Sequence, residues 1–331
     1  MSTPLLEVRD LTIDIDTRYG QARIVDGVSF SLSKGETLGV VGESGCGKSL
    51  TMMSLLGLLP RKIAVSGGAA TFEGQDLFGL RGEELRKLRG GRIGFIFQDP
   101  MTSFNPVMRI GDQLMEPLIH HRGMDKTAAR KRAGELMRLV GIPGGEARLD
   151  NYPHQLSGGM RQRVMIAMGL ACEPPLLIAD EPTTALDVTI QSQVVELVKD
   201  IRNKLDMSVI WITHDLALIA GLVDRIIVLY AGTIVEEALV DDLYARPQHP
   251  YTIGLLASLP KLTPGKVAEK YLPSIGGTPP EPGRRPAGCP FAPRCARKLA
   301  VCETAVPRLD GLVENATHRV ACFAVTGVPS S

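Results

Sequence analysis

The N-terminal part of the chain alternates between hydrophobic and polar residues. Residues 5–16 (LLEVRDLTIDID) change character at most positions, which is typical of a strand with one buried and one exposed face. Residues 23–33 are expected to form another strand, and residues 66–77 a strand followed by a turn. Residues 225–236 are expected to form a hairpin that turns at Ala231 and Gly232.

Three short apolar runs, residues 92–97, 176–179 and 208–213, are predicted to be buried strands. Each run is followed directly by polar side chains. Ligands bind at the carboxyl ends of strands in a parallel sheet, so these side chains are candidates for chemistry. They are Gln98, the pair Asp180 and Glu181, and His214 with Asp215.

The acidic pair suggests two separate roles. Asp180 can hold Mg²⁺ directly or through water, and Glu181 can polarise an attacking water molecule. The alternative is a pair of surface acids that caps a strand, but a strand buried on both faces rarely ends in two adjacent acids by chance. A single histidine is more often structural than catalytic. The place of His214 at a strand end, like that of Asp180, favours a functional role.

Helical spacing of apolar residues separates the predicted strands. A loop is expected between two of the helical segments, at residues 143–148. The expected helices cover residues 83–89, 111–140, 188–205 and 253–258.

A glycine-rich stretch that follows an apolar run carries the strongest chemical signal. Residues 42–49 (GESGCGKS) fit the pattern GxxxxGK(S/T), and a helical pattern follows. Glycines allow backbone N–H groups to surround phosphate oxygens, and the helix N-terminus adds partial positive charge. Lys48 is expected to reach the β- and γ-phosphates, and Ser49 to bind Mg²⁺. The other expected nucleotide contacts in the loop come from Gly42, Glu43, Ser44, Gly45, Cys46, Gly47 and Leu50.

A second anion-binding turn is expected near residue 157. Ser157, Gly158 and Gly159 lie where a helix should begin, and the helical pattern continues through Leu170. Serine is a favoured first residue of a helix, and the exposed backbone N–H groups there attract anions.

Composition narrows the class of protein. The 331 residues suffice for one large or two ordinary domains, and 44% are hydrophobic. A net charge of +1 gives no global electrostatic reason to expect nucleic acid as a partner. No apolar run approaches the ~18–20 residues that span a bilayer. Acidic residues near the N-terminus are unlike a signal peptide, so a cytoplasmic location is expected.

The composition changes after residue 259. We expect a nucleotide-binding domain at residues 1–259, a linker rich in proline and glycine at 260–288, and an extension at 289–331. Clustered cysteines in a cytoplasmic chain suggest a metal before a disulfide. Zinc ligands usually come in closer pairs, whereas thiolates also hold 4Fe-4S clusters with irregular spacing. Zinc and metal-free thiols remain alternatives for Cys289, Cys295, Cys302 and Cys322.

Taken in order, these motifs resemble the nucleotide-binding subunits of ABC transporters. The resemblance covers about residues 5–245. The motifs are the phosphate loop at 42–49, the Q-loop Gln98, the signature LSGGM at 156–160, Asp180 with Glu181, the D-loop Ala185, Leu186 and Asp187, and the switch His214. Within the family, the chain is similar to the dipeptide and oligopeptide importer subunits, and nickel importers share much of this pattern. That similarity is carried by residues 97–106 (FQDPMTSFNP), 152–160 (YPHQLSGGM), 246–252 (RPQHPYT) and the cysteine-bearing tail.

The resemblance implies a P-loop NTPase cassette of the α/β class. It would have a RecA-like core, an antiparallel β subdomain, a helical signature subdomain and a small Cys-rich C-terminal extension. It also implies that two cassettes meet head to tail around ATP and Mg²⁺. Lys48, Ser49, Gln98, Asp180, Glu181 and His214 would face one nucleotide, and Ser157 and Gly159 would complete the partner's site. Glu181 would act as the base, His214 would contact the γ-phosphate, and Gln98 would link Mg²⁺ to the loop that touches the membrane subunits.

Some positions depart from the family or leave a role open. Met160 stands where most ABC proteins have glutamine, although the peptide-importer branch is similar here. The aromatic residue that would stack on adenine is Tyr19 in our interpretation, with Ile15 the alternative by spacing and a simple turn tyrosine equally compatible. Cys46 is expected to be a small filler whose thiol, at an electropositive helix end, could be modified.

The resemblance also implies partners. These are a second ABC ATPase subunit, expected to form a heterodimer with this chain, two transmembrane permease subunits and an extracytoplasmic solute-binding protein. The chain would lie on the cytoplasmic face of the membrane as a peripheral subunit. In similar peptide-importer subunits the tail is associated with a 4Fe-4S cluster. The rival interpretations are import of nickel or another small solute, a soluble ABC ATPase that acts on DNA or ribosomes, and a redox-sensing module centred on the cysteines.

Overall fold

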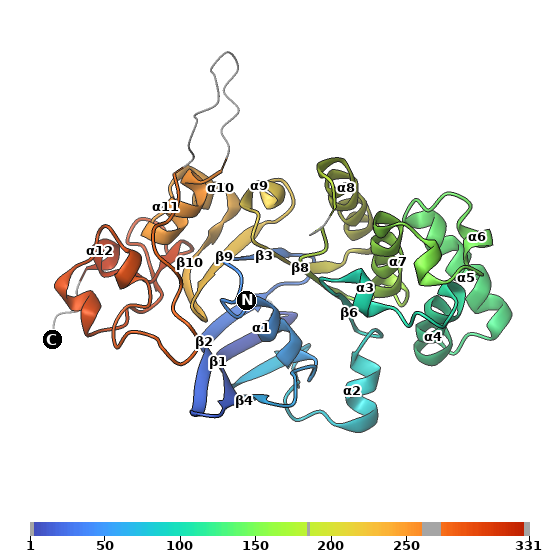
Figure 1. Cartoon of the computed structure of the whole chain (residues 1–331), viewed down its shortest axis with the longest axis horizontal. Helices are drawn as coiled ribbons and strands as arrows, with labels where there is room; N and C mark the ends of the chain where they lie inside the picture. Colours follow the sequence, from blue (N-terminus) through green and yellow to red (C-terminus); the bar gives the residue numbers. More distant parts are fainter. Residues whose placement is uncertain (1–2, 184–185, 260–272, 328–331) are drawn as a thin grey trace, which may run out of the picture. The chain divides into compact units, whose positions relative to one another are not determined.

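The computed structural model describes residues 3–183, 186–259 and 273–327 (Figure 1). The chain forms two compact units. The described residues of Met1–Leu5, Leu32–Thr37 and Phe72–Ile212 make the first unit. Those of Leu6–Ser31, Leu38–Thr71 and Thr213–Ser331 make the second unit. The D-loop residue Ala185 and the first half of the predicted linker lie outside the described residues.

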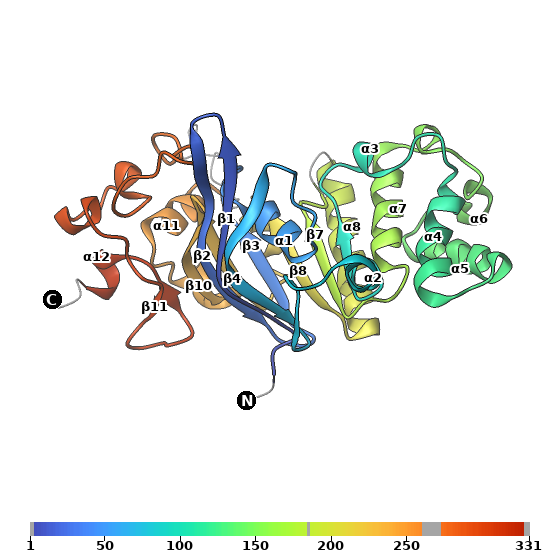
Figure 2. The ribbon, with the colours of Figure 1, turned by 90° about the horizontal axis from the view of Figure 1, so that it is seen from below.

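The second unit contains two groups of strands. In one, β1 lies between β2 and β4, as Figure 2 shows from below. In the other, β10 pairs with β9 and β12, and β9 pairs in parallel with β3. The bounds are β1 Leu6–Thr17, β2 Gly20–Leu32, β3 Thr37–Val41, β4 Ile63–Phe72, β9 Arg225–Tyr230, β10 Thr233–Leu239, β11 Asp310–Gly311 and β12 Arg319–Val320. The helices are α1 Lys48–Leu55, α9 Leu216–Ile219, α10 Val240–Ala245, α11 Pro250–Ala257 and α12 Phe323–Thr326, with 3₁₀ turns at Ala292–Arg294 and Ala300–Glu303.

The first unit is built on parallel strands. β7 (Leu176–Asp180) pairs with β6 (Ile93–Ile96) on one side and with β8 (Ser208–Thr213) on the other. β7 and β8 are buried at every position, which explains why their sequences are continuous apolar runs instead of alternating ones. The remaining elements are β5 Gln75–Asp76, α2 Gly82–Leu88, α3 Pro100–Ser103, α4 Ile110–Arg122, α5 Lys126–Leu139, α6 Gly145–Arg148, a 3₁₀ turn at Pro153–Gln155, α7 Gly158–Leu170 and α8 Val188–Leu205.

Local chemistry explains where the helices of the first unit begin and end. The Asp125 side chain accepts a hydrogen bond from the backbone N–H of Ala128 at the start of α5, and Asp187 accepts one from Ile190 at the start of α8. Gly123 ends α4 in the left-handed conformation, with φ of 63°. In Figures 1 and 2 the helices α4 to α7 lie together in this unit.

Most of the predicted strands and helices are confirmed, with a few corrections. The segment 111–140 is two helices, because Gly123 and Asp125 end one and begin the next. Residues 145–148 are a short helix, α6, where a loop was expected. α11 begins at Pro250, before the expected start, because proline is favoured in the first turn and the His249 side chain caps it. The described part of the linker, residues 273–288, contains no helix or strand.

Within residues 3–183, 186–259 and 273–327, no helix combines the length and the apolar character needed to cross a membrane.

Candidate nucleotide site and C-terminal cysteines

The phosphate loop joins the fully buried strand β3 to helix α1 in the second unit. Two of its glycines are required by geometry. A Cβ on Gly42 would lie 2.2 Å from the carbonyl oxygen of Leu229, and Gly47 has φ of 100° immediately before the helix. Side chains at these positions would push the loop out of this shape.

Lys48 lies folded back over this loop. Its side-chain Nζ donates to the carbonyl oxygen of Gly42 at 2.7 Å and to that of Glu43 at 3.1 Å, and the residue is 4% exposed. The backbone N–H of Gly232 donates to the carbonyl of Cys46 at 2.9 Å, which fixes the middle of the loop against the β9–β10 turn. The loop therefore presents a buried ammonium group and the N-terminus of a helix, which is the arrangement that binds phosphate.

Gln98 and Glu181 come together in the first unit. They follow the adjacent parallel strands β6 and β7, so both lie at the same edge of the sheet. The side-chain Nε2 of Gln98 donates to the Glu181 carboxylate at 3.1 Å. Asp180 and Glu181 are 5% and 8% exposed, so two carboxylates end a buried strand as predicted.

The backbone of Glu181 is held in an unusual conformation. Its φ of 46° is left-handed, which is uncommon for a residue with a side chain. Its backbone N–H donates to the carbonyl of Ile212 at 3.0 Å. Such a conformation costs roughly 1–3 kcal/mol and persists at sites where it places a side chain for function. No pattern in the sequence predicts this conformation.

The signature segment begins α7 in the first unit, as predicted. The Ser157 hydroxyl accepts a hydrogen bond from the backbone N–H of Met160 at 3.3 Å, so Ser157 is the N-cap. Ser157 and Gly158 are exposed. The exposed N-terminus of this 13-residue helix can therefore receive an anion from outside the chain.

His214 and Tyr19 belong to the second unit, and both are exposed. Tyr19 is 87% exposed, and the guanidinium of Arg18 lies 5.1 Å from its ring centre. Next to His214, the Asp215 carboxylate caps α9 by accepting from the backbone N–H of Ala217 at 2.9 Å. These contacts do not test whether His214 contacts the γ-phosphate or Tyr19 stacks on the base, so both roles stay predictions.

Two properties were expected of Cys46: that it fills space inside the loop and that its thiol could be modified. Its burial agrees with the first of these. It is 6% exposed, and burial raises the pKa of its thiol even though Lys48 opposes this. The expectation that the thiol would be open to modification is wrong, because a buried protonated thiol is a poor nucleophile.

The four C-terminal cysteines gather in one part of the second unit. Cys289, Cys302 and Cys322 are buried, and Cys295 is partly exposed. Burial, helped by the neighbouring thiols of Cys302 and Cys322, raises the pKa of Cys289 to about 11. The donor set of four thiols suits iron–sulfur or zinc. However, the described residues contain no group of three or more His, Cys, Asp and Glu side chains arranged to hold a metal ion.

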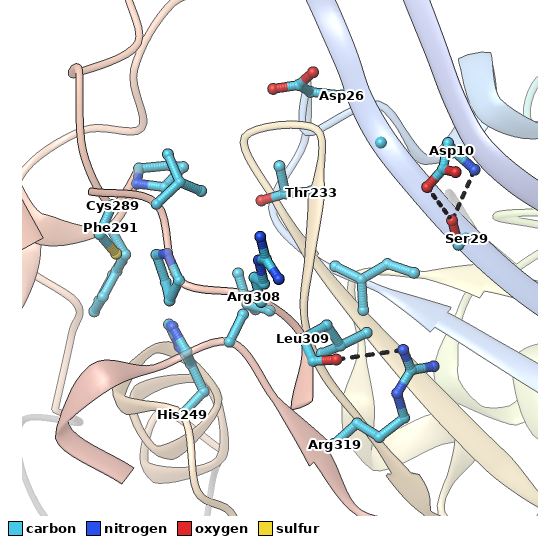
Figure 3. A pocket seen from close by; sticks show the side chains of 17 residues that line it. Asp10, Asp26, Ser29, Thr233, His249, Cys289, Phe291, Arg308, Leu309 and Arg319 are labelled. Carbon is cyan, nitrogen blue, oxygen red and sulfur yellow. Dashed lines mark hydrogen bonds between the residues drawn. The ribbon is translucent and has the colours of Figure 1, made fainter. Parts of the chain in front are cut away.

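A cavity of about 420 Å³ lies beside this cysteine-bearing segment (Figure 3). Arg319, which donates to the carbonyl of Leu309, and the hydrogen-bonded pair Asp10 and Ser29 are among the residues that line it. The lining also includes Cys289, one of the four predicted metal ligands. The cavity mixes acidic and basic side chains and lacks the phosphate loop in its lining, so it is separate from the predicted nucleotide contacts.

Comparison with known proteins decides the family. Residues 25–184 match the sequence profile of the ABC transporter family, and residues 235–302 match that of the oligopeptide/dipeptide transporter C-terminal region. The dipeptide transport ATP-binding protein DppD of Bacillus subtilis is 50% identical over 320 residues, which cover 96% of this chain and 94% of the relative. The chain belongs to the dipeptide/oligopeptide branch of the ABC transporter ATP-binding proteins.

Other relatives agree with this assignment. The oligopeptide transport ATP-binding protein OppD is 52% identical in Bacillus subtilis (90% of this chain and 83% of the relative) and 47% identical in Escherichia coli (92% and 89%). A solved dimeric structure of the ATP-binding cassette MJ0796 bound to ADP and Pi matches with a TM-score of 0.65 and 29% identity. The match covers 71% of this chain and 98% of that one. The expected ABC cassette fold is therefore confirmed, and ATP-binding subunits of this family hydrolyse ATP.

The matched C-terminal region includes two residues for which the sequence predicted no role at the nucleotide site. Arg294 and Tyr251 lie within the matched C-terminal region and, as described below, contact the phosphate loop. Tyr251 lies in the block 246–252 that carries the peptide-importer similarity, but no spacing predicts that either residue touches the loop. Only their contacts in the structure identify this role.

Proposed function

We propose that this chain is the ATP-hydrolysing subunit that energises import of dipeptides or oligopeptides by an ABC transporter. The phosphate loop carries the assignment of nucleotide binding, because the buried Lys48 ammonium group and the N-terminus of α1 lie together there. Hydrolysis of ATP is inferred from the ABC transporter family to which the chain belongs. The transported solute is inferred from the peptide transport proteins to which the chain is 47–52% identical.

The proposed roles of the site residues follow the chemistry of phosphoryl transfer. Lys48 and the amides of residues 42–50 hold the phosphates, while Ser49, Asp180 and Gln98 hold Mg²⁺ directly or through water. Glu181 accepts the proton of the attacking water, and its bond from Gln98 orients the carboxylate for this. His214 contacts the γ-phosphate, Tyr19 stacks on the base, and Ser157 with the two glycines after it binds a nucleotide held by a second cassette.

The proposed assembly contains a related second ABC ATPase, two permease subunits and a solute-binding protein, with this chain peripheral on the cytoplasmic face of the membrane. Phe97, Met101 and Val107 are exposed apolar residues around Gln98, which suits a surface that meets permease loops. Import of nickel or another small solute is the alternative for the same machinery. The matched C-terminal region, described as that of oligopeptide/dipeptide transporters, favours peptides.

The test of the proposed function combines one substitution with one substrate series. In the reconstituted transporter, E181Q should bind Mg-ATP normally but lose turnover by roughly 10²–10⁴-fold, because the amide is a poor base. Surface Glu173 offers a matched control, and E173Q should keep wild-type turnover. Dipeptides delivered by the solute-binding protein should stimulate ATP hydrolysis. Normal turnover in E181Q would refute the assigned base, and stimulation by Ni²⁺ alone would refute peptide import.

For the cysteine tail we propose a 4Fe-4S cluster held by Cys289, Cys295, Cys302 and Cys322, with a structural role. The support is four thiols in one neighbourhood; the ligand arrangement itself is not formed among the described residues. Iron and acid-labile sulfide should be present at about four of each per chain after anaerobic purification. Stoichiometric zinc without sulfide, or neither metal, would contradict the proposal.

A further inference from the structure

The C-terminal segment reaches the phosphate loop through one ion pair. The Arg294 guanidinium forms two parallel contacts with the Glu43 carboxylate, Nη1 to Oε2 at 2.7 Å and Nη2 to Oε1 at 3.0 Å. Glu43 is the second residue of the phosphate loop, and Arg294 directly precedes Cys295. Both residues belong to the second unit. Bidentate pairs of this kind fix direction as well as distance.

Arg294 is itself held firmly. Its Nε donates to the carbonyl of Gly276 at 2.9 Å, and its Nη2 donates to that of Ile275 at 3.3 Å. The guanidinium lies 5.7 Å from the ring centre of Tyr230, and the side chain is 4% exposed. An arginine fixed on this many sides has lost its side-chain freedom already, so the pair with Glu43 is preorganised.

The backbone of Glu43 is also held by a residue of helix α11. Its N–H donates to the hydroxyl oxygen of Tyr251 at 2.9 Å. Tyr251 is fully buried, and its ring packs against Tyr230 and Phe291 with ring centres 4.7 Å and 5.5 Å away. The carbonyl of Glu43 accepts from Lys48 at 3.1 Å. Glu43 therefore connects the C-terminal segment to the lysine that is expected to contact phosphate.

We propose that Arg294 is a positioning residue for ATP: through Glu43 it sets the shape of the phosphate loop, so that the C-terminal segment controls nucleotide affinity. This inference rests on the proposed function, because it assigns the loop to ATP. A purely electrostatic role makes a different prediction. If Arg294 only neutralised the Glu43 charge, R294Q would weaken ATP binding while E43Q would strengthen it, since each substitution changes the net charge in the opposite direction.

The test is a double-mutant cycle on the full-length chain. Mg-ATP affinity is measured by titration calorimetry for the wild type, R294Q, E43Q and the double variant, with thermal unfolding of each in the absence of nucleotide. We expect each single substitution to raise Kd about tenfold, and the double variant to resemble the worse single variant, because one interaction is lost in all three. R294K keeps the charge but not the two parallel bonds, and should fall between the wild type and R294Q.

Arg319 provides the matched control, because it pairs with Glu237 at 3.0 Å and so joins the tail to β10. Its hydrogen bonds within the described part of the chain go to Glu237 and Leu309, not to the phosphate loop. R319Q should leave Kd unchanged. An unchanged Kd in R294Q, or shifts of Kd in opposite directions in R294Q and E43Q, would overturn the inference. The proposed function would still stand in that case, provided that the wild type binds Mg-ATP and K48A does not. A wild-type chain that binds no Mg-ATP would overturn the proposed function as well.

Discussion

Protonation of His249 is predicted to lower the free energy of unfolding by an amount that can be worked out from the structure. The residue is 1% exposed, and its Nδ1 accepts a hydrogen bond from the backbone N–H of Tyr251 at 3.1 Å, which caps α11. A protonated imidazole could not accept this bond. The same helix cap positions Tyr251, whose hydroxyl accepts from the phosphate loop. The prediction therefore concerns the support of the nucleotide site as well as stability.

The sign and size follow from the shift in pKa. Burial lowers the pKa of His249 from 6.5 to about 4, although the nearby Glu236 carboxylate opposes the shift. Since the unfolded chain binds the proton more readily, the stabilisation is fully present above pH 6.5 and is lost as the pH falls toward 4. Between pH 7.5 and pH 5 the free energy of unfolding should decrease by about 2 kcal/mol from this residue alone, at 1.36 kcal/mol per pKa unit.

The assay is urea unfolding followed by circular dichroism at several pH values for the wild type and H249N. Asparagine is a good N-cap and does not titrate, so the variant keeps the cap and removes the proton site. The difference between the two proteins isolates His249 from Glu236 and His318, which are joined at 2.7 Å in the same buried network. Parallel pH dependence in the two proteins would refute the reasoning.

Two further predictions concern the phosphate loop and helix α8. G42A should weaken Mg-ATP binding at least roughly tenfold, because the new Cβ would lie 2.2 Å from the Leu229 carbonyl oxygen; G221A, whose Cβ would meet nothing within 4 Å, should bind as the wild type does. Equal affinities of G42A and G221A in a calorimetric titration would show that the loop tolerates the methyl group. In urea unfolding, D187A should lower the free energy of unfolding by about 1 kcal/mol because it removes the cap of α8. D187N should retain most of the wild-type free energy of unfolding, because asparagine also caps helices. A smaller loss in D187A than in D187N would contradict the capping role.

Local patterns in the sequence were sufficient to predict most of the strands and helices and the phosphate loop. The apolar runs that became β6, β7 and β8 are continuous because these strands are buried, and the polar residues after them follow from strand ends. The phosphate loop was predictable because its glycines, lysine and serine are neighbours in the chain, although distant residues such as Leu229 and Arg294 also contact it. The caps at Ser157 and Asp187 are local for the same reason.

Contacts between distant residues were decided only by the tertiary structure. Gln98 meets Glu181 because two separate strands pair in a particular register, and the left-handed φ of Glu181 depends on the strand beside it. The short helix α6 forms where turn residues alone indicated a loop. Arg294 and Glu43 are brought together by packing of the C-terminal segment, which no periodicity or motif encodes. A sequence determines which groups each segment carries, whereas long-range packing of the folded chain determines which of those groups meet.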